Sequence, residues 1–280
     1  MNLFNLKKIR ELIFVILCVF LITSNAYAQQ EEPSPLKPGK FHTQRETGIY
    51  FGLGQNIQSG SFFTKCDCPE FENGVAFGWK AGLLYEQDIT PVLQIGAAVG
   101  INQAGVTASY QYNKDRVFTT DIGGTIISDT VPILFRQQAE TQFLNFDLMP
   151  YLKWTATDFF FLRLGFNLAF NITSNIRHSE EILQTTVKLP STGEIVEVTF
   201  EDGSTKVVVE DNAFPDVVSP QFYVVPAVGF TIPLSTNIFL SPVFDYSLPL
   251  SEMSSNGNNF KISNWRFIAE LRWAIKLRQE

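Results

Sequence analysis

Charged side chains occupy alternate positions within otherwise apolar stretches, and these residues are the first candidates for chemistry. Lys153 and Arg163 stand in such stretches, as do Glu270 and Arg272. Alternate side chains of an extended chain share one face, so each stretch would present its charges opposite its apolar residues. If these stretches are strands of a sheet that closes around a narrow lumen, as the alternation below indicates, the charges point inward. The pattern predicts this set of inward charges: Lys80, Glu86, Asp147, Lys153, Arg163, Asp245, Arg266, Glu270, Arg272 and Lys276.

These inward charges allow two kinds of chemistry. Because an unpaired buried charge costs several kcal/mol, cations and anions that face one narrow lumen would form ion pairs. We therefore predict a structural network that fills the interior. The alternative is a gated path for small ions, for which inward glycines such as Gly52, Gly82 and Gly96 leave room. Inward aromatic residues, including Tyr151 and Phe161, favour the closed lumen because they would cover these glycines.

Catalytic and metal-binding candidates are few. A hydrolytic triad needs side chains that converge. His42 lies in the linker, and His178 is followed directly by Ser179 and Glu180, whose side chains would point to opposite sides of an extended chain. We expect no enzyme activity, although lipid-modifying barrel enzymes are a known alternative. A disulfide between Cys66 and Cys68 would be strained, which leaves pairing between chains or a weak metal site as alternatives. We predict no metal site and no cofactor.

The stretch from Phe143 to Ile172 shows best which elements must position these residues. Leu144, Phe146 and Leu148 fall on one face of an extended chain, and the alternation continues to Trp154. After the turn at 155–158 the same period of two resumes. A helix would scatter these apolar groups around its whole circumference, so the stretch predicts two long β-strands joined by a tight turn.

Residues 1–28 have the pattern of a secretory signal peptide. Lys7, Lys8 and Arg10 precede an apolar run, and Ala26-Tyr27-Ala28 forms a cleavage site. Its removal takes away a net charge of +2, so the net charge of −7 becomes −9. An acidic exported chain is a poor binder of nucleic acid. Residues 29–47, which are rich in proline and charge, predict a periplasmic linker.

The remaining chain, 48–280, predicts one β-barrel domain. No stretch after residue 28 is long and apolar enough to form a transmembrane helix, so membrane insertion would use strands. The connections alternate between long and short, which places the short turns and both ends of the barrel on one side. The strands that the alternation predicts are 48–58, 75–86, 92–102, 143–154, 160–172, 222–232, 238–247 and 265–277.

The apolar face must point outward, because the interior of an eight-stranded barrel is barely wide enough for its own side chains. The reverse arrangement would place Lys80, Arg163 and other charges in lipid, at roughly 2–4 kcal/mol each near the midplane. Aromatic residues on the outward face predict the girdles that flank the apolar band. The predicted girdle residues are Trp79, Tyr85, Trp154, Trp265 and Trp273.

Two long connections predict structure outside the membrane. In 173–221, the segments Ile195–Phe200 and Thr205–Val209 flank Glu201-Asp202-Gly203-Ser204 and predict a β-hairpin. In 103–142, the segments Val106–Tyr112 and Val117–Ile127 indicate either extensions of the neighbouring strands or an added pair of strands. The strand number is therefore either eight or ten, and eight is preferred. The acidic residues of 173–221 indicate a solvated surface.

Two segments carry a resemblance to a known family. Leu148-Met149-Pro150-Tyr151-Leu152-Lys153-Trp154 ends one strand, and Phe161-Leu162-Arg163-Leu164-Gly165 begins the next. This pattern resembles the PorT-like outer-membrane β-barrel family of the Bacteroidota and relatives, barrels of the OmpA- and OmpX-like eight-stranded type. The resemblance implies the fold and an outer-membrane location with periplasmic termini, and it assigns no activity.

The sequence thus predicts an all-β protein, an eight-stranded antiparallel up-and-down transmembrane barrel with long extracellular loops and a filled interior. We expect a structural or interaction protein of the outer membrane of a Gram-negative bacterium. Its partners would be outer-membrane lipid and, through the outer loops, envelope or extracellular proteins, with no nucleic acid. The alternative function is a small channel for ions or small solutes.

Overall fold

The computed structural model describes residues 45–64, 69–122, 125–157 and 159–275. The predicted signal peptide, His42, Cys66, Cys68 and Lys276 lie outside the described residues. Of the predicted linker 29–47, only the last three residues are described, and they belong to the first strand, which begins at Arg45.

Eight strands form a closed antiparallel ring, which confirms the predicted barrel and its strand number. Each strand pairs with its neighbours in the sequence, and the last pairs with the first, so Ile275 lies opposite Arg45. The ring consists of β1 (Arg45–Phe62), β3 (Val75–Thr90), β4 (Leu93–Ile122), β5 (Thr125–Thr155), β6 (Phe160–Ile182), β10 (Gln221–Phe230), β12 (Ile238–Pro249) and β13 (Gly257–Ile275). Among the described residues no helix is long and apolar enough to cross a membrane.

The connections are short at one end of the barrel and long at the other, as the sequence predicts. β3 passes into β4 through two residues, Pro91 and Val92. Arg45 pairs with both Gln87 and Ile275, so the described ends of the chain lie at the end with the short connections. The long connections at the other end contain β2 (Phe71–Glu72), β7 (Thr186–Lys188), β8 (Ile195–Glu197) and β9 (Lys206–Ala213). β11 (Ile232–Pro233) lies in the short connection between β10 and β12 and pairs with β12.

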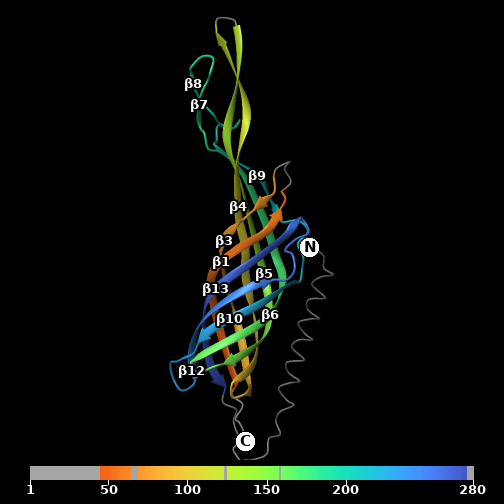
Figure 1. Cartoon of the computed structure of the whole chain (residues 1–280), viewed down its shortest axis with the longest axis vertical. Coiled ribbons are helices and arrows are strands. Elements are labelled where there is room, and N and C mark those ends of the chain that lie inside the picture. The colour runs from red at the N-terminus through yellow and green to blue at the C-terminus, as the bar shows by residue number, and fades with distance from the viewer. Residues whose placement is uncertain (1–44, 65–68, 123–124, 158, 276–280) are drawn as a thin grey trace, which may run out of the picture. The chain divides into compact units, whose positions relative to one another are not determined.

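β4 and β5 continue far beyond the ring as one twisted ribbon (Figure 1). Their pairing runs from Leu93↔Trp154 to Ile122↔Thr125 without a register shift. Residues 106–122 and 125–127 are therefore extensions of these strands, and they add no pair of strands to the ring. β3 pairs with β4 only as far as Thr107, whereas β6 follows β5 as far as Ile182.

The predicted hairpin within 173–221 pairs differently from the expectation. The segment around Ile195 pairs as β8 with β7, and Lys206–Ala213 pairs as β9 with β6. A tight turn remains at 200–204, where Gly203 N donates to Phe200 O at 3.0 Å. The physical reason is that β10 covers the edge of β6 only as far as Ala169, so the upper part of β6 offers β9 a longer ladder.

Burial is inverted relative to a water-soluble protein. Phe166, Phe244 and Phe267 are 40%, 38% and 64% exposed, whereas Arg163, Arg266 and Arg272 are at most 4% exposed. Exposed apolar side chains alternate with buried polar ones along β5, β6 and β13. Such a surface fits contact with lipid and is unfavourable in water. The barrel is therefore of the transmembrane type.

Candidate functional site

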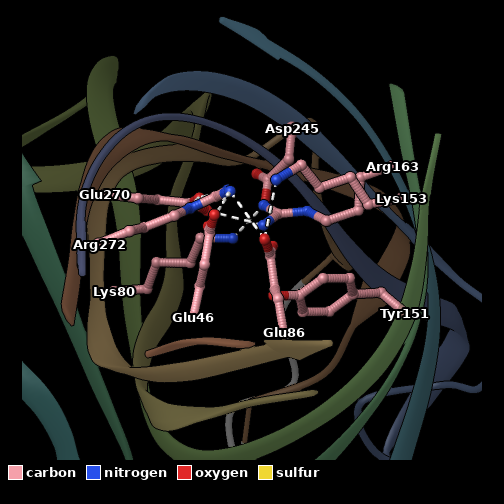
Figure 2. Close-up of polar contacts among 9 residues, drawn as sticks. All are labelled: Glu46, Lys80, Glu86, Tyr151, Lys153, Arg163, Asp245, Glu270 and Arg272. Atoms are coloured by element: carbon pink, nitrogen blue, oxygen red, sulfur yellow. Dashed lines mark hydrogen bonds and ion pairs between the residues drawn. The ribbon is translucent and has the colours of Figure 1, made fainter. Parts of the chain in front are cut away.

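The lumen contains a network of ion pairs near the end with the short connections, and Glu86 of β3 is its centre. The Glu86 carboxylate accepts hydrogen bonds from Tyr151 Oη, Lys153 Nζ and an Arg272 guanidinium nitrogen, each at 2.8 Å. Glu86 is 1% exposed. Figure 2 shows these side chains converging from strands on opposite sides of the barrel.

A second carboxylate, Glu270 of β13, joins the two arginines of the network. Arg163 donates to Glu270 at 2.7 Å, and Arg272 donates through Nε at 3.0 Å and through a second, shorter contact. Aromatic rings cover the same cations, because the Arg163 guanidinium lies 4.9 Å from the ring centroid of Tyr151. Lys153 Nζ lies 4.5 Å from the ring centroid of Phe161. Such contacts stabilise buried cations beyond their ion pairs.

Glu46 belongs to this network and was missed in the sequence. Its carboxylate lies 3.8 Å from Arg272. The signal that could have found it is the alternation of faces, because Glu46 shares the inward face with Gly48 and Tyr50. It was missed because the first strand was predicted to begin only at residue 48. The cations of the described lumen are Lys80, Lys153, Arg163, Arg266 and Arg272, and the carboxylates that face them include Glu46, Glu86, Asp147, Asp245 and Glu270.

Further along the lumen, toward the end with the long connections, Lys80 pairs with Asp245. Beyond this pair, Arg266 forms a second group of polar contacts. Arg266 donates to Asn56 Oδ1 at 2.5 Å and to the carbonyls of Gln55 and Trp265 at 3.0 Å. Asp147 lines a cavity of about 10 Å³ together with other polar and apolar side chains. That volume holds about one water molecule. The lining residues are Tyr50, Lys80, Asn102, Asp147, Met149, Asn167, Val225 and Ser247.

Inward aromatic residues fill the space above the glycines, as the sequence predicts. A Cβ atom added to Gly96 would lie 2.5 Å from the ring of Tyr151, and one added to Gly229 would lie 2.4 Å from Phe161. Tyr151 and Phe161 are 3% and 0% exposed. The glycines therefore make room for rings, and they leave no passage at these points.

A hydrophobic cap closes the lumen at the end with the long connections. Phe62 is its centre, with ring centroids of Phe71, Phe214 and Phe260 at 5.5, 5.7 and 5.0 Å. Phe71, Phe214 and Met253 come from three different long connections, which are tied together by bonds such as Val218 N to Met253 O at 3.0 Å. This cap was not predicted from the sequence. The cap consists of Phe62, Phe71, Phe143, Phe214, Met253 and Phe260 with smaller apolar residues.

The protruding strands have a small core of their own. β7 and β8 cover the inner face of the ribbon, where Phe135 and Ile182 pack against Val187 and Val198. Arg116 donates to Thr199 O at 3.3 Å and lies 5.6 Å from the ring centroid of Phe135. We call β4 beyond Thr107, β5 before Phe143, β6 beyond Ile172 and β7–β9 the outer sheet. The outer sheet is thus an ordered structure, whereas the sequence indicated only extensions and a hairpin.

The outer sheet is acidic. Residues 103–142 and 173–221 hold thirteen Asp or Glu and six Lys or Arg, a net charge of −7. Opposite charges lie in register on its outer face, as where Glu140, Arg177 and Asp211 follow one another across β5, β6 and β9. Among the described residues no three His, Cys, Asp or Glu side chains are grouped to hold a metal ion.

Of the two histidines considered for catalysis, His178 is the one that the structure describes. It lies in β6, within the outer sheet. Its side chain is buried, with its ring 5.3 Å from that of Phe71 and Nε2 2.6 Å from Gln137 Oε1. Burial lowers the pKa of His178, and the nearby carboxylates of Glu210 and Glu180 oppose this effect. The side chain therefore packs as part of the sheet above the cap.

The predicted girdle residues all point away from the lumen. Tyr85 and Trp273 both pair with Thr47 near the short connections, and Trp154 pairs with Leu93 at the same end. Trp265 lies farther along β13 and packs against Phe244 and Phe267, with ring centroids 6.4 and 5.7 Å away. Trp79 pairs with Leu53.

The chain matches no protein-family model. It also matches none of the curated proteins. Among solved structures, the attachment invasion locus protein Ail of Yersinia pestis is 10% identical, with 82% of this chain and 99% of Ail covered and a TM-score of 0.33. Neisserial surface protein A is 9% identical, with 81% and 96% covered and a TM-score of 0.33. The outer membrane protease OmpT from Escherichia coli is 10% identical, with 83% and 97% covered and a TM-score of 0.31. Likeness at this level says nothing about what this chain binds.

Proposed function

We propose that this protein is an outer-membrane β-barrel of the interaction type, whose barrel is a closed anchor and whose outer sheet contacts other molecules. The observation that carries the proposal is the filled lumen. Ion pairs around Glu86, the level of Arg266 and the cap around Phe62 close it at successive heights. Meanwhile β4 and β5 continue well beyond the ring.

The location is part of the proposal. An export signal at residues 1–28 supports transport across the inner membrane. Short connections and both described chain ends at one side support a barrel with periplasmic termini and outward long connections. On the outward face of β5, the apolar Leu144 is followed toward the outer sheet by the polar Gln142. This change of polarity supports placing the outer sheet outside the lipid. The pattern at 148–154 and 161–165 supports a PorT-like barrel.

Two observations favour an interaction role over enzymatic and channel functions. For catalysis, the buried His178 is held between Phe71 and Gln137. For conduction, the cavity beside Asp147 has room for about one water molecule and lies below the cap. Planar bilayers test the closed lumen directly, because we expect no unitary currents from the refolded protein. Reproducible unitary currents would support the channel and contradict the proposal.

Photo-crosslinking in native outer membranes tests the interaction role. We would place a photoreactive side chain at Val117 of the outer sheet, which is 65% exposed, and at Phe267 of the lipid-facing surface, which is 64% exposed. The proposal predicts adducts with polypeptide at Val117 and adducts with lipid alone at Phe267. If both positions yield lipid alone, the outer sheet is not the interaction surface.

A further inference from the structure

The two edges of the outer sheet differ. At one edge β9 pairs with β6, and this ladder contains a register shift between His178 and Ser179. At the other edge β4 beyond Thr107 pairs only with β5 among the described strands. Residues 108–122 contain no proline and no glycine, and their pairing with β5 has no bulge. Bulges and prolines are how proteins blunt an edge, so the β4 edge is open and the β9 edge is interrupted.

The direction of the backbone groups at the β4 edge follows from one hydrogen bond. Thr155 N donates to Val92 O at 2.8 Å, and the register of β4 and β5 is unbroken from that end to Ile122. Hydrogen-bonded pairs alternate along an antiparallel ladder, so even-numbered residues of β4 bond to β5. The odd-numbered residues bond to β3 as far as Thr107. Beyond it, the N–H and C=O groups of the odd-numbered residues from Ser109 to Thr119 point away from β5.

We propose that this free edge, the odd-numbered residues from Ser109 to Thr119, binds an extended, basic segment of another protein as an added β-strand. The inference rests on the proposed interaction function and names the partner's chemistry. Every odd side chain from Ser109 to Thr119 is exposed, so nothing described in the chain covers the outer face of this strand. Strand addition gives affinity through the main chain and selectivity through alternate side chains.

Charge selects a basic segment over an acidic one. Residues 103–142 and 173–221, which include the outer sheet, carry a net charge of −7, which attracts a cationic chain from a distance. At the edge itself Asp115 is exposed on the outer face, and the neighbouring Lys114 is exposed on the opposite, inner face. Arg116, on the inner face, is already engaged by Thr199 O and the rings of Phe135 and Phe200. Basic side chains of the added strand would therefore lie beside Asp115, and its other side chains would lie beside Tyr112 and Phe118.

A short synthetic peptide in which lysine alternates with threonine and valine serves as the probe. Its fluorescence anisotropy is measured with the full chain in detergent micelles. One control peptide has glutamate in place of lysine, and another has N-methylated backbone amides. We expect the unmodified basic peptide to bind about tenfold more tightly than the methylated one, because methylation removes the backbone donors. Equal binding of the basic and methylated peptides, or of the basic and acidic peptides, would overturn the proposal.

Matched proline variants locate the site on the protein. Asn113→Pro removes one N–H from the free edge and leaves the bonds to β5 intact. Val208→Pro makes the same change at the β9 edge, because Ile182 N bonds to Thr205 O and the alternation then points Val208 N–H away from β6. We expect Asn113→Pro to weaken peptide binding about tenfold and Val208→Pro to leave it unchanged. The reverse result, or equal binding by both variants, overturns the assignment.

Two further outcomes separate this inference from the proposed function. If the wild-type chain dimerises in detergent and Asn113→Pro abolishes the dimer, the edge belongs to a second copy and the basic-segment proposal fails. If the crosslink from Val117 to polypeptide persists in Asn113→Pro, the strand-addition proposal fails while the interaction function stands. Loss of that crosslink in Asn113→Pro but not in Val208→Pro supports both.

Discussion

Replacing Glu86 with glutamine tests the ion-pair network most directly. The change keeps the shape of the side chain and removes the charge that Lys153 and Arg272 share at 2.8 Å each. Arg272 retains Glu270, whereas Lys153 loses its closest carboxylate. Removing one partner of a buried pair costs about 3–5 kcal/mol, because the remaining charge stays buried without compensation. We therefore expect Glu86→Gln to lower the free energy of unfolding by about that amount.

The assay is urea unfolding in lipid vesicles, followed by tryptophan fluorescence. Glu181→Gln is the matched control, because Glu181 pairs with Arg136 at 3.3 Å on the exposed outer sheet, where an ion pair contributes at most about 1 kcal/mol. Adding Lys153→Met to Glu86→Gln removes the uncompensated charge and should restore most of the loss. If Glu86→Gln costs no more than Glu181→Gln, water reaches the network and the closed lumen is wrong.

Four other changes test separate parts of the structure. Phe260→Ala should cost about 3–5 kcal/mol in the same unfolding assay, because Phe260 is fully buried in the cap; a change below 1 kcal/mol would mean that the cap is loose. Gly229→Ala should cost about 1–3 kcal/mol, since the added methyl meets Phe161, and near-neutral stability would contradict that packing. Phe267→Arg should cost about 2–4 kcal/mol if this side chain faces lipid near the midplane, whereas a neutral result would place it in water. The neutral form of His178 is favoured by folding, so its stabilising effect is complete above its unfolded pKa of about 6.5 and declines as pH falls below that value. Urea unfolding from pH 7 to 5 should therefore show a smaller loss of stability in His178→Gln, and equal losses would refute this assignment.

The barrel strands could be predicted because two constraints agree in them. Along β5 and β6 the outward face must be apolar for lipid, and the inward face must be small, polar or aromatic to fit the lumen. This agreement predicted both the alternation around Leu148 and the inward position of Lys153. It could not predict where a strand ends, because outside lipid the outward face is free to be polar. The strands β1, β4, β5 and β6 all run on past the predicted limits, and Glu46 was missed for that reason.

The individual partners in the lumen could not be read from the sequence. Parity places Glu86 and Arg272 on the inward face, but it does not say that β3 and β13 bring them within 2.8 Å. Strand tilt and register decide that contact, and neither is encoded in the pattern of one strand. The cap was missed for a related reason. Phe71, Phe214 and Met253 come from irregular connections, where no period of two marks the inward face.

The unbroken register of β4 and β5 links the two halves of the molecule. Slipping one strand by one residue exchanges its faces. Within the barrel such a slip would put Asp147 into lipid, and within the outer sheet it would expose Phe135. Because both penalties act on the same pair of strands, the barrel and the small outer core fix one register together. The free edge from Ser109 to Thr119 is therefore held in a defined orientation by a rigid base, so a strand can be added there without the entropic cost of first ordering a flexible loop.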